Sequence, residues 1–163
     1  MKTGGVSGAG TDANVFIVIY GEYGDTGKIA LKKSRTNKNA FEKDRVDSFN
    51  EVARYVGRIK KVRIGHDNKG SFAGWYLENV TINVPSLNCE WTFVADRWLD
   101  KGKGDKEIEI DIYPTSVEKT EGKLKNFDLY TLHSLNTRPL KCVFSPTQHC
   151  YRQILESYEK DQT

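Results

Sequence analysis

The sequence predicts a single antiparallel β-sandwich over residues 1–114. The chain has 163 residues, enough for one domain with a hydrophobic core and too few for two full domains. Short strand-like runs recur at intervals of about 8–15 residues and are separated by turn residues, which is typical of sandwiches. Pro114 ends this pattern, and the following residues differ in character. We therefore treat residues 115–163 as a C-terminal tail.

The first strands are indicated by β-branched and aromatic residues between turn residues. Residues 14–20, NVFIVIY, form the first strand, and GEYGDTG at 21–27 forms the turn after it. Further strands are predicted at 28–33 and 47–52, on either side of a polar loop.

The later strands are indicated by alternation of apolar and polar residues. Residues 58–64 alternate with one slip, and residues 75–84 alternate with a shift near Glu78 and Asn79 that predicts a β-bulge. Two more strands follow at 89–99 and 107–113. In the last of these, three isoleucines alternate with acids and are predicted to face the core: Ile108, Ile110 and Ile112.

The composition is that of a soluble globular protein. Hydrophobic residues make up 37% and charged residues 29% of the chain, while the net charge of +3 arises from 25 basic and 22 acidic side chains. This mixed surface does not favour nucleic-acid binding. Since no apolar run reaches about 18–20 residues and the start lacks an apolar signal core, we expect no transmembrane segment and a cytoplasmic location. Three sparse cysteines are expected to be reduced thiols.

The sequence predicts no enzyme. It contains no G-x-S-x-G elbow, phosphate loop, H-E-x-x-H helix or dinucleotide fingerprint. A zinc site could in principle form from the histidines and cysteines of the tail, but their spacing matches no zinc pattern: His133, Cys142, His149 and Cys150.

Two glycine-rich loops contain the candidate metal ligands. SGAGTDAN at 7–14 holds Asp12, and GHDNKGSFAGW at 65–75 holds Asp67. Calcium prefers oxygen ligands from carboxylates and carbonyls, and glycine allows the backbone to turn its carbonyls toward an ion. The alternative is that Asp12 caps a turn and that Asp67 with Asn68 forms an Asx-turn.

The tail ends in a segment with helical periodicity. Within residues 148–160, one face of a short amphipathic helix would carry four apolar side chains: Tyr151, Ile154, Leu155 and Tyr158. Its partner could be the sandwich or another protein.

Four stretches together resemble the PLAT, or lipoxygenase-homology, domain: GAGTDANVFIVIYGEYGDTGKIALKKS, FEKDRVDSF, VGRIKKVRIGHDNKGSFAGWYLENVTI and ADRWLDKGKGD. The resemblance covers about residues 4–114 and is strongest to the repeats of multi-PLAT proteins in hair-cell stereocilia. It implies an eight-stranded sandwich of two four-stranded sheets, docking to membranes or partner proteins, and frequent calcium binding at one loop end. Residues 115–163 do not share this resemblance.

The resemblance also implies specific ligands. Calcium would be held by the carbonyls of Gly8 and Gly10 with the Asp12 carboxylate, and by Asp67 with the carbonyls of Ser71 and Gly74. A weaker second site would lie near Asn39 and Glu42.

The sequence departs from the family pattern at the loop tips. Lipoxygenases carry exposed tryptophans there, whereas this chain has Ser7 and Gly70, and Phe72 is the large apolar residue of the second loop. The three tryptophans of this chain match positions where an aromatic side chain usually packs in or beside the core: Trp75, Trp91 and Trp98. No lipoxygenase catalytic domain is present.

Three functions follow as hypotheses. The first is a calcium-linked adaptor on an anionic membrane, with Phe72 and three lysines as contacts: Lys38, Lys43 and Lys69. The second is a protein–protein scaffold with structural calcium or none. The third is a regulatory domain of a larger lipid-acting enzyme. The strongest resemblance places the protein at the membrane periphery, in stereocilia.

Overall fold

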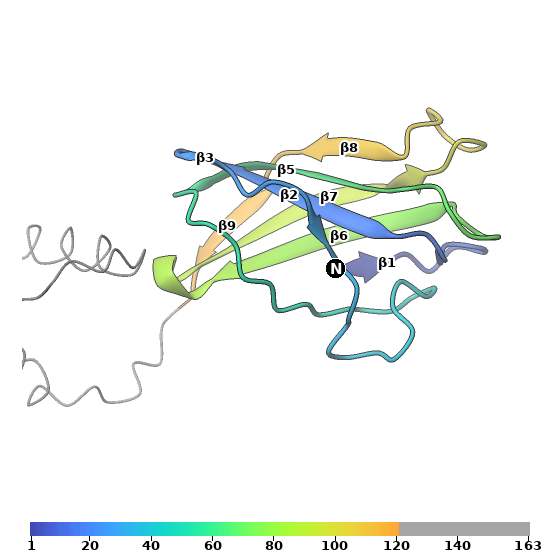
Figure 1. The fold of residues 1–163 in the computed structure, drawn as a ribbon, viewed down its shortest axis with the longest axis horizontal. Helices are drawn as coiled ribbons and strands as arrows, with labels where there is room; N and C mark the ends of the chain where they lie inside the picture. The colour runs from blue at the N-terminus through green and yellow to red at the C-terminus, as the bar shows by residue number, and fades with distance from the viewer. Residues whose placement is uncertain (121–163) are drawn as a thin grey trace, which may run out of the picture.

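The computed structural model describes residues 1–120 and shows two antiparallel sheets packed face to face (Figure 1). One sheet has four strands in the order β1 (Lys2–Thr3), β6 (Trp75–Val84), β7 (Cys89–Leu99) and β9 (Ser116–Lys119). The other has five: β3 (Gly24–Asp25), β2 (Val15–Gly21), β5 (Ile59–His66) and β8 (Glu109–Ile112) in order, with β4 (Ile29–Ala30) also paired to β2. A short 3-10 helix, η1 (Pro85–Leu87), joins β6 to β7. The all-β sandwich is confirmed.

The core lies between the two sheets because alternate residues of the central strands face inward. Ile17 of β2 pairs with Ile64 of β5, and Ile19 pairs with Val62. The opposing sheet contributes large buried side chains, among them Trp75, Leu77, Trp91, Phe93 and Leu99. Each fully buried side chain of this size contributes roughly 1.5–3 kcal/mol or more to folding. The alternation read from the sequence therefore identifies the buried face.

The β-bulge predicted near Glu78 and Asn79 is present, but its extra residue lies in β7 and not in β6. Leu77 pairs with Arg97, whereas Asn79 pairs with Val94, so the register shifts between Leu77 and Asn79. Asp96 has a φ of 45°, which places the irregularity of the partner strand at this point.

The structure differs from the strand predictions in three places. Residues 47–52 form no strand, because the Asp47 carboxylate accepts hydrogen bonds from the Phe41 backbone and the Asn37 side chain and so stabilises a loop. β1 and β3 are two-residue strands without a periodic signal. The two sheets thus have four and five strands, instead of the four each that the resemblance implies.

The third difference is β9, which lies beyond Pro114, the residue at which the sequence pattern predicts the end of the sandwich. It pairs with β7, with Val117 opposite Trp91. The Thr115 backbone N–H donates to the Thr92 carbonyl at 2.8 Å, which begins the pairing. The sandwich therefore extends to Lys119.

Residues 121–163 lie outside the described part of the chain. The expected amphipathic helix at 148–160 and the cysteines and histidines of the tail fall there. No helix within residues 1–120 is long and apolar enough to cross a membrane.

Candidate functional site

The two glycine-rich loops lie against each other at one end of the sandwich, on the right in Figure 1. The first loop precedes β2 and the second follows β5, and these strands are neighbours with Val15 opposite His66. The Asp12 backbone N–H donates to the Phe72 carbonyl at 3.0 Å, and the Thr11 hydroxyl donates to the Ala73 carbonyl at 2.8 Å. The sheet register thus brings together the two loops that the sequence singles out.

Gly70 allows the close approach of the loops. Its φ is 97°, a conformation that favours glycine, and a Cβ there would lie 2.8 Å from the Cβ of Asp12. Asp12 and Gly70 are therefore in direct contact. A side chain at position 70 would force the first loop away.

The Asp67 carboxylate accepts three hydrogen bonds. The Asn14 backbone N–H donates to Oδ1 at 3.1 Å, the Asn14 side-chain amide donates to Oδ2 at 2.7 Å, and the Lys69 N–H donates to Oδ1 at 3.1 Å. The Asn14 side-chain bond is the main cause that lowers the pKa of Asp67 to about 2. Asp67 is therefore ionised at neutral pH, and the predicted Asx-turn with Lys69 is present alongside the link to the first loop.

Gly10 lies on the other side of the first loop. A Cβ there would lie 3.1 Å from the Phe41 carbonyl oxygen and 3.3 Å from Glu42 Cα, and the Thr11 N–H donates to the Phe41 carbonyl. The Asn39 side-chain amide is hydrogen-bonded to the Glu42 carboxylate. The residues proposed for the second site therefore adjoin the first loop. Gly8 has a φ of 70° and no neighbour within 4 Å of the position its Cβ would take.

Gly74 faces Asp100, an acid that is not among the ligands predicted from the sequence. A Cβ at Gly74 would lie 2.0 Å from Asp100 Oδ2, so the missing side chain makes room for this carboxylate. Asp100 Oδ1 accepts the Gly102 N–H at 2.7 Å, while Lys103 lies 3.8 Å from Oδ2. The loop DKGKGDK that begins with Asp100 combines acids and glycines as the other two loops do, and this was the signal available in the sequence.

His66 supports the second loop from below. It is 2% exposed, its Nε2 bonds the Leu99 carbonyl at 2.9 Å, and its Nδ1 accepts the Asn68 N–H at 3.1 Å. Since a ring nitrogen facing a carbonyl must donate, Nε2 carries the proton. Asn68 has a φ of 57°, and this bond stabilises that turn. A lone histidine carries no sequence signal for such a role.

The donor chemistry of this loop end fits a hard cation. Carboxylate and carbonyl oxygens are the ligands calcium prefers. Residues 1–120 contain no cluster of three or more His, Cys, Asp or Glu side chains arranged to hold a metal. A cation here would thus depend on the carboxylates of Asp12 and Asp67 together with backbone carbonyls and water, as in the predicted ligand set.

Two of the predicted contact residues, Phe72 and Lys69, lie on the second glycine-rich loop. Phe72 is 76% exposed although it is a large apolar side chain, and the Lys69 side chain is 78% exposed. Lys38 and Lys43 are exposed as well, but they lie on a different loop, the one that contains Asn39 and Glu42. Apolar and basic side chains therefore extend from this end of the sandwich.

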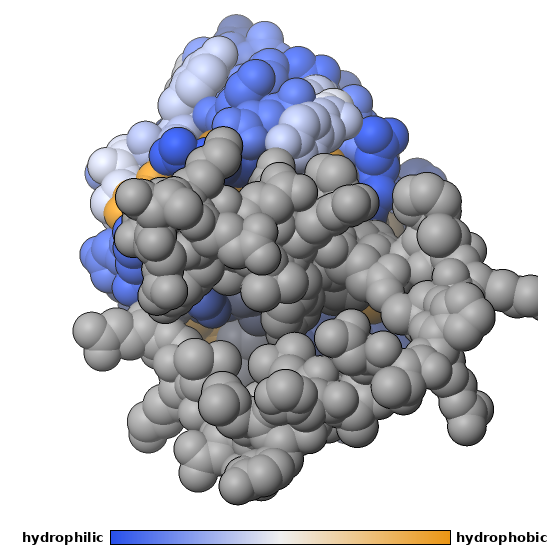
Figure 2. Space-filling model, turned by 90° about the vertical axis from the view of Figure 1, so that its left-hand side faces the viewer, coloured by the Kyte–Doolittle hydropathy of each residue, from blue (hydrophilic) through white to orange (hydrophobic). Residues whose placement is uncertain are grey.

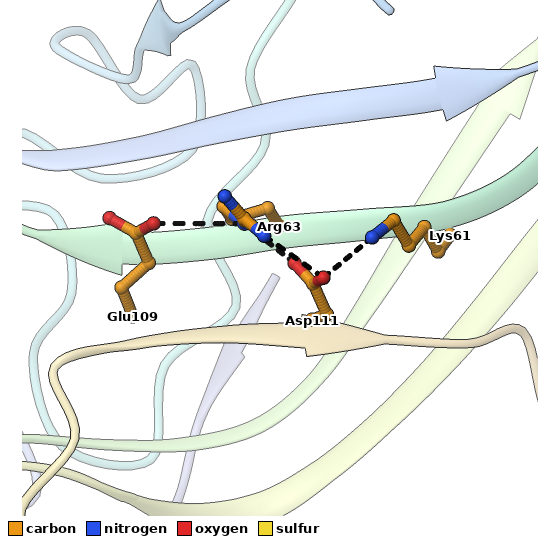
Figure 3. A network of polar contacts seen from close by, with 4 residues as sticks. All are labelled: Lys61, Arg63, Glu109 and Asp111. Atoms are coloured by element: carbon orange, nitrogen blue, oxygen red, sulfur yellow. Dashed lines mark hydrogen bonds and ion pairs between the residues drawn. The ribbon is translucent and has the colours of Figure 1, made fainter.

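A second charged cluster lies on the outer face of β5 and β8 (Figure 3). Asp111 accepts hydrogen bonds from Lys61 at 2.6 Å and from Arg63 at 2.6 Å, and Arg63 also lies 3.6 Å from Glu109. These cations lower the pKa of Asp111 to about 2. Two cations and two acids pair with one another, so this cluster stabilises the edge strand β8.

Comparison with known proteins agrees with this architecture. The PLAT/LH2 domain family model matches residues 1–111. Lipoxygenase homology domain-containing protein 1 of Mus musculus is 44% identical over 130 residues, and the protein of that name in Homo sapiens is 42% identical over 130 residues. Each alignment covers 79% of this chain and 6% of the relative, so the chain spans a small part of these proteins.

Solved lipoxygenases share the fold. The crystal structure of coral 8R-lipoxygenase superposes with a TM-score of 0.59 at 25% identity, covering 69% of this chain and 16% of that one. That enzyme is described as activated by calcium through a C2-like domain. A lipoxygenase variant superposes with a TM-score of 0.60 at 24% identity.

Proposed function

The chain belongs to the PLAT/LH2 domain family, and on this premise we propose that it is a non-catalytic binding module whose loop end takes up calcium and meets an anionic membrane surface. Relatives with similar sequences include lipoxygenase homology domain-containing protein 1 and Polycystin-1. A position at the membrane periphery inside the cell, as in stereocilia, belongs to this proposal.

One observation supports it above the others: the loops holding Asp12 and Asp67 contact each other directly beside an exposed phenylalanine. Without a cation, two carboxylates at this end oppose approach to an anionic surface. A bound calcium ion would cancel their charge. Phe72 could then enter the interface, while each lysine near the surface contributes about 1 kcal/mol of attraction.

The residues that would hold calcium have distinct tasks. Asp12 and Asp67 supply negative charge, and Gly8, Gly10, Ser71 and Gly74 supply backbone carbonyls. Asn14 and His66 orient the second loop through the Asp67 carboxylate and the Asn68 N–H. Calcium, when bound, supplies positive charge facing the membrane.

Liposome co-sedimentation tests the proposal. The protein is mixed with vesicles of phosphatidylcholine alone or with phosphatidylserine, in calcium or in a chelator. We expect pelleting with phosphatidylserine and calcium, reduced by Phe72→Ser. Tyr23→Ser is the matched control, because Tyr23 is also an exposed aromatic, at 57%, but lies beyond the far end of β2. It should pellet as the wild type does.

The outcomes separate the alternatives. Pelleting that is equal with and without calcium would refute the calcium link. No pelleting under any condition would favour the protein–protein scaffold, for which the small residues at both loop tips are the supporting feature. Turnover of a polyunsaturated fatty acid or a triglyceride by the purified chain would contradict the non-catalytic role.

A further inference from the structure

A cavity of about 290 Å³ lies at the end of the sandwich opposite the glycine-rich loops. One wall is the segment 51–57, and the other is the end of β6 with the start of η1. Its floor is apolar and includes Ile19, Ile82 and Val84, which pack against the core but remain partly exposed. Figure 2 faces this end, where apolar residues reach the surface among hydrophilic ones. Residues 1–120 therefore leave the hydrophobic core incompletely covered here.

The chain leaves the sandwich at the rim of this cavity. The Thr120 N–H donates to the Asn88 carbonyl at 2.8 Å. Asn88 caps η1, whose residues Pro85 and Ser86 line the cavity. Residues 121–163 therefore start beside an uncovered apolar surface.

We propose that the segment 148–160 of this same chain docks in the cavity through its apolar stripe. The stripe carries Tyr151, Ile154, Leu155 and Tyr158 at helical spacing. A cavity of about 150 Å³ holds a benzene ring, so this one has room for roughly two such side chains. The occupant would close the gap between the two sheets.

The tether favours this occupant over a separate molecule. Residues 121–147 join the exit point to the segment, and a flexible chain of that length spans roughly 30 Å on average. Such a tether gives an effective concentration on the order of millimolar, so weak contacts suffice. The inference is independent of the calcium proposal, since the cavity lies at the other end of the strands.

Two native cysteines provide the test. Cys89 is half-buried and follows Asn88 directly, at the rim, while Cys150 precedes Tyr151 in the docking segment. In the full chain carrying Cys142→Ser, docking predicts that a short bismaleimide links Cys89 to Cys150 within one molecule. Mass spectrometry of the digested monomer identifies the link.

Matched variants test which face docks. Ile154→Asp with Leu155→Asp should lower the yield several-fold, and so should Ala53→Trp, which fills the cavity from its wall. Gln153→Asp, on the opposite face of the predicted helix, should leave the yield unchanged. An equal yield in all variants, or links that form only between molecules and rise with concentration, would overturn the proposal.

Hydrogen exchange gives a second readout that does not depend on cysteine reactivity. Docking predicts that amides in 51–57 exchange faster in the Ile154→Asp, Leu155→Asp variant than in the full wild-type chain. Exchange at β2 and β5 serves as the internal control for folding. Unchanged exchange at 51–57 with intact strands would contradict docking.

Discussion

Asp67 and Asn14 are joined by three hydrogen bonds: the backbone and side-chain amides of Asn14 donate to the Asp67 carboxylate, and the Asp67 N–H donates to the Asn14 carbonyl. Asn14 precedes β2 directly, and Asp67 follows β5 directly. The link therefore continues the pairing of these two strands into the loops. This link holds the two loops, and with them the candidate ligands Asp12 and Asp67, in position before any ion is present.

This link predicts a pH-dependent contribution to stability. The pKa of Asp67 is lowered from 3.8 to about 2, mainly by the Asn14 side chain. A depressed pKa means that the stabilisation is complete above the unfolded value and is lost as pH falls from about 4 toward 2. We expect Asp67→Asn to melt below the wild type at pH 7 and the difference to disappear near pH 2. Asp111 titrates in the same range but is common to both proteins. A difference that persists at pH 2 would contradict this assignment.

Calcium should raise the melting temperature of the wild type. A ligand present at a hundredfold excess over its Kd stabilises the native state by about 2.7 kcal/mol. The double variant Asp12→Asn, Asp67→Asn should lose this rise. The charge-matched control is Glu22→Gln, Asp25→Asn at the far turn, which should retain it. If the double variant still responds, calcium binds elsewhere in the chain.

The buried Trp75 depends on Thr3 for its hydrogen bond. The indole Nε1–H donates to the Thr3 hydroxyl at 3.0 Å, and both residues are buried. Thr3→Val keeps the shape but leaves the indole N–H unpaired, which costs roughly 1–3 kcal/mol. Urea denaturation measures the change. Trp75→Phe with Thr3→Val removes the orphaned donor, so its cost should be less than the sum of the single changes.

Strand β9 predicts where the chain can be shortened. A variant ending at Thr120 should unfold cooperatively, because it keeps every described strand. A variant ending at Pro114 loses the pairing of β9 with β7 and uncovers the edge beside Trp91, so it should melt at a lower temperature. Calorimetry of both variants provides the test. Absence of a cooperative transition in the longer one would show that residues after 120 belong to the core.

Much of the fold could be predicted from the sequence because side-chain alternation records which face of a strand is buried. The long strands β5, β6 and β7 and the bulge near Asn79 follow from that pattern, while β2 follows from its run of β-branched and aromatic residues. The sequence also identified the glycine-rich loops with Asp12 and Asp67, since glycine and acids mark turns capable of holding ions.

Tertiary structure alone decided the rest. β1 has only two residues and β9 is exposed throughout, so neither shows an alternation of apolar and polar residues. They form strands because the backbone groups of β6 and β7 are available for pairing. Residues 47–52 are predicted as a strand but form a loop, because the Asp47 carboxylate accepts a hydrogen bond from the Phe41 backbone amide six residues earlier. The partnership of Asp67 with Asn14, and the approach of Asp100 to Gly74, depend on which strands become neighbours. Contacts between residues far apart in the chain leave no local pattern, so only the packed sheets bring them into view.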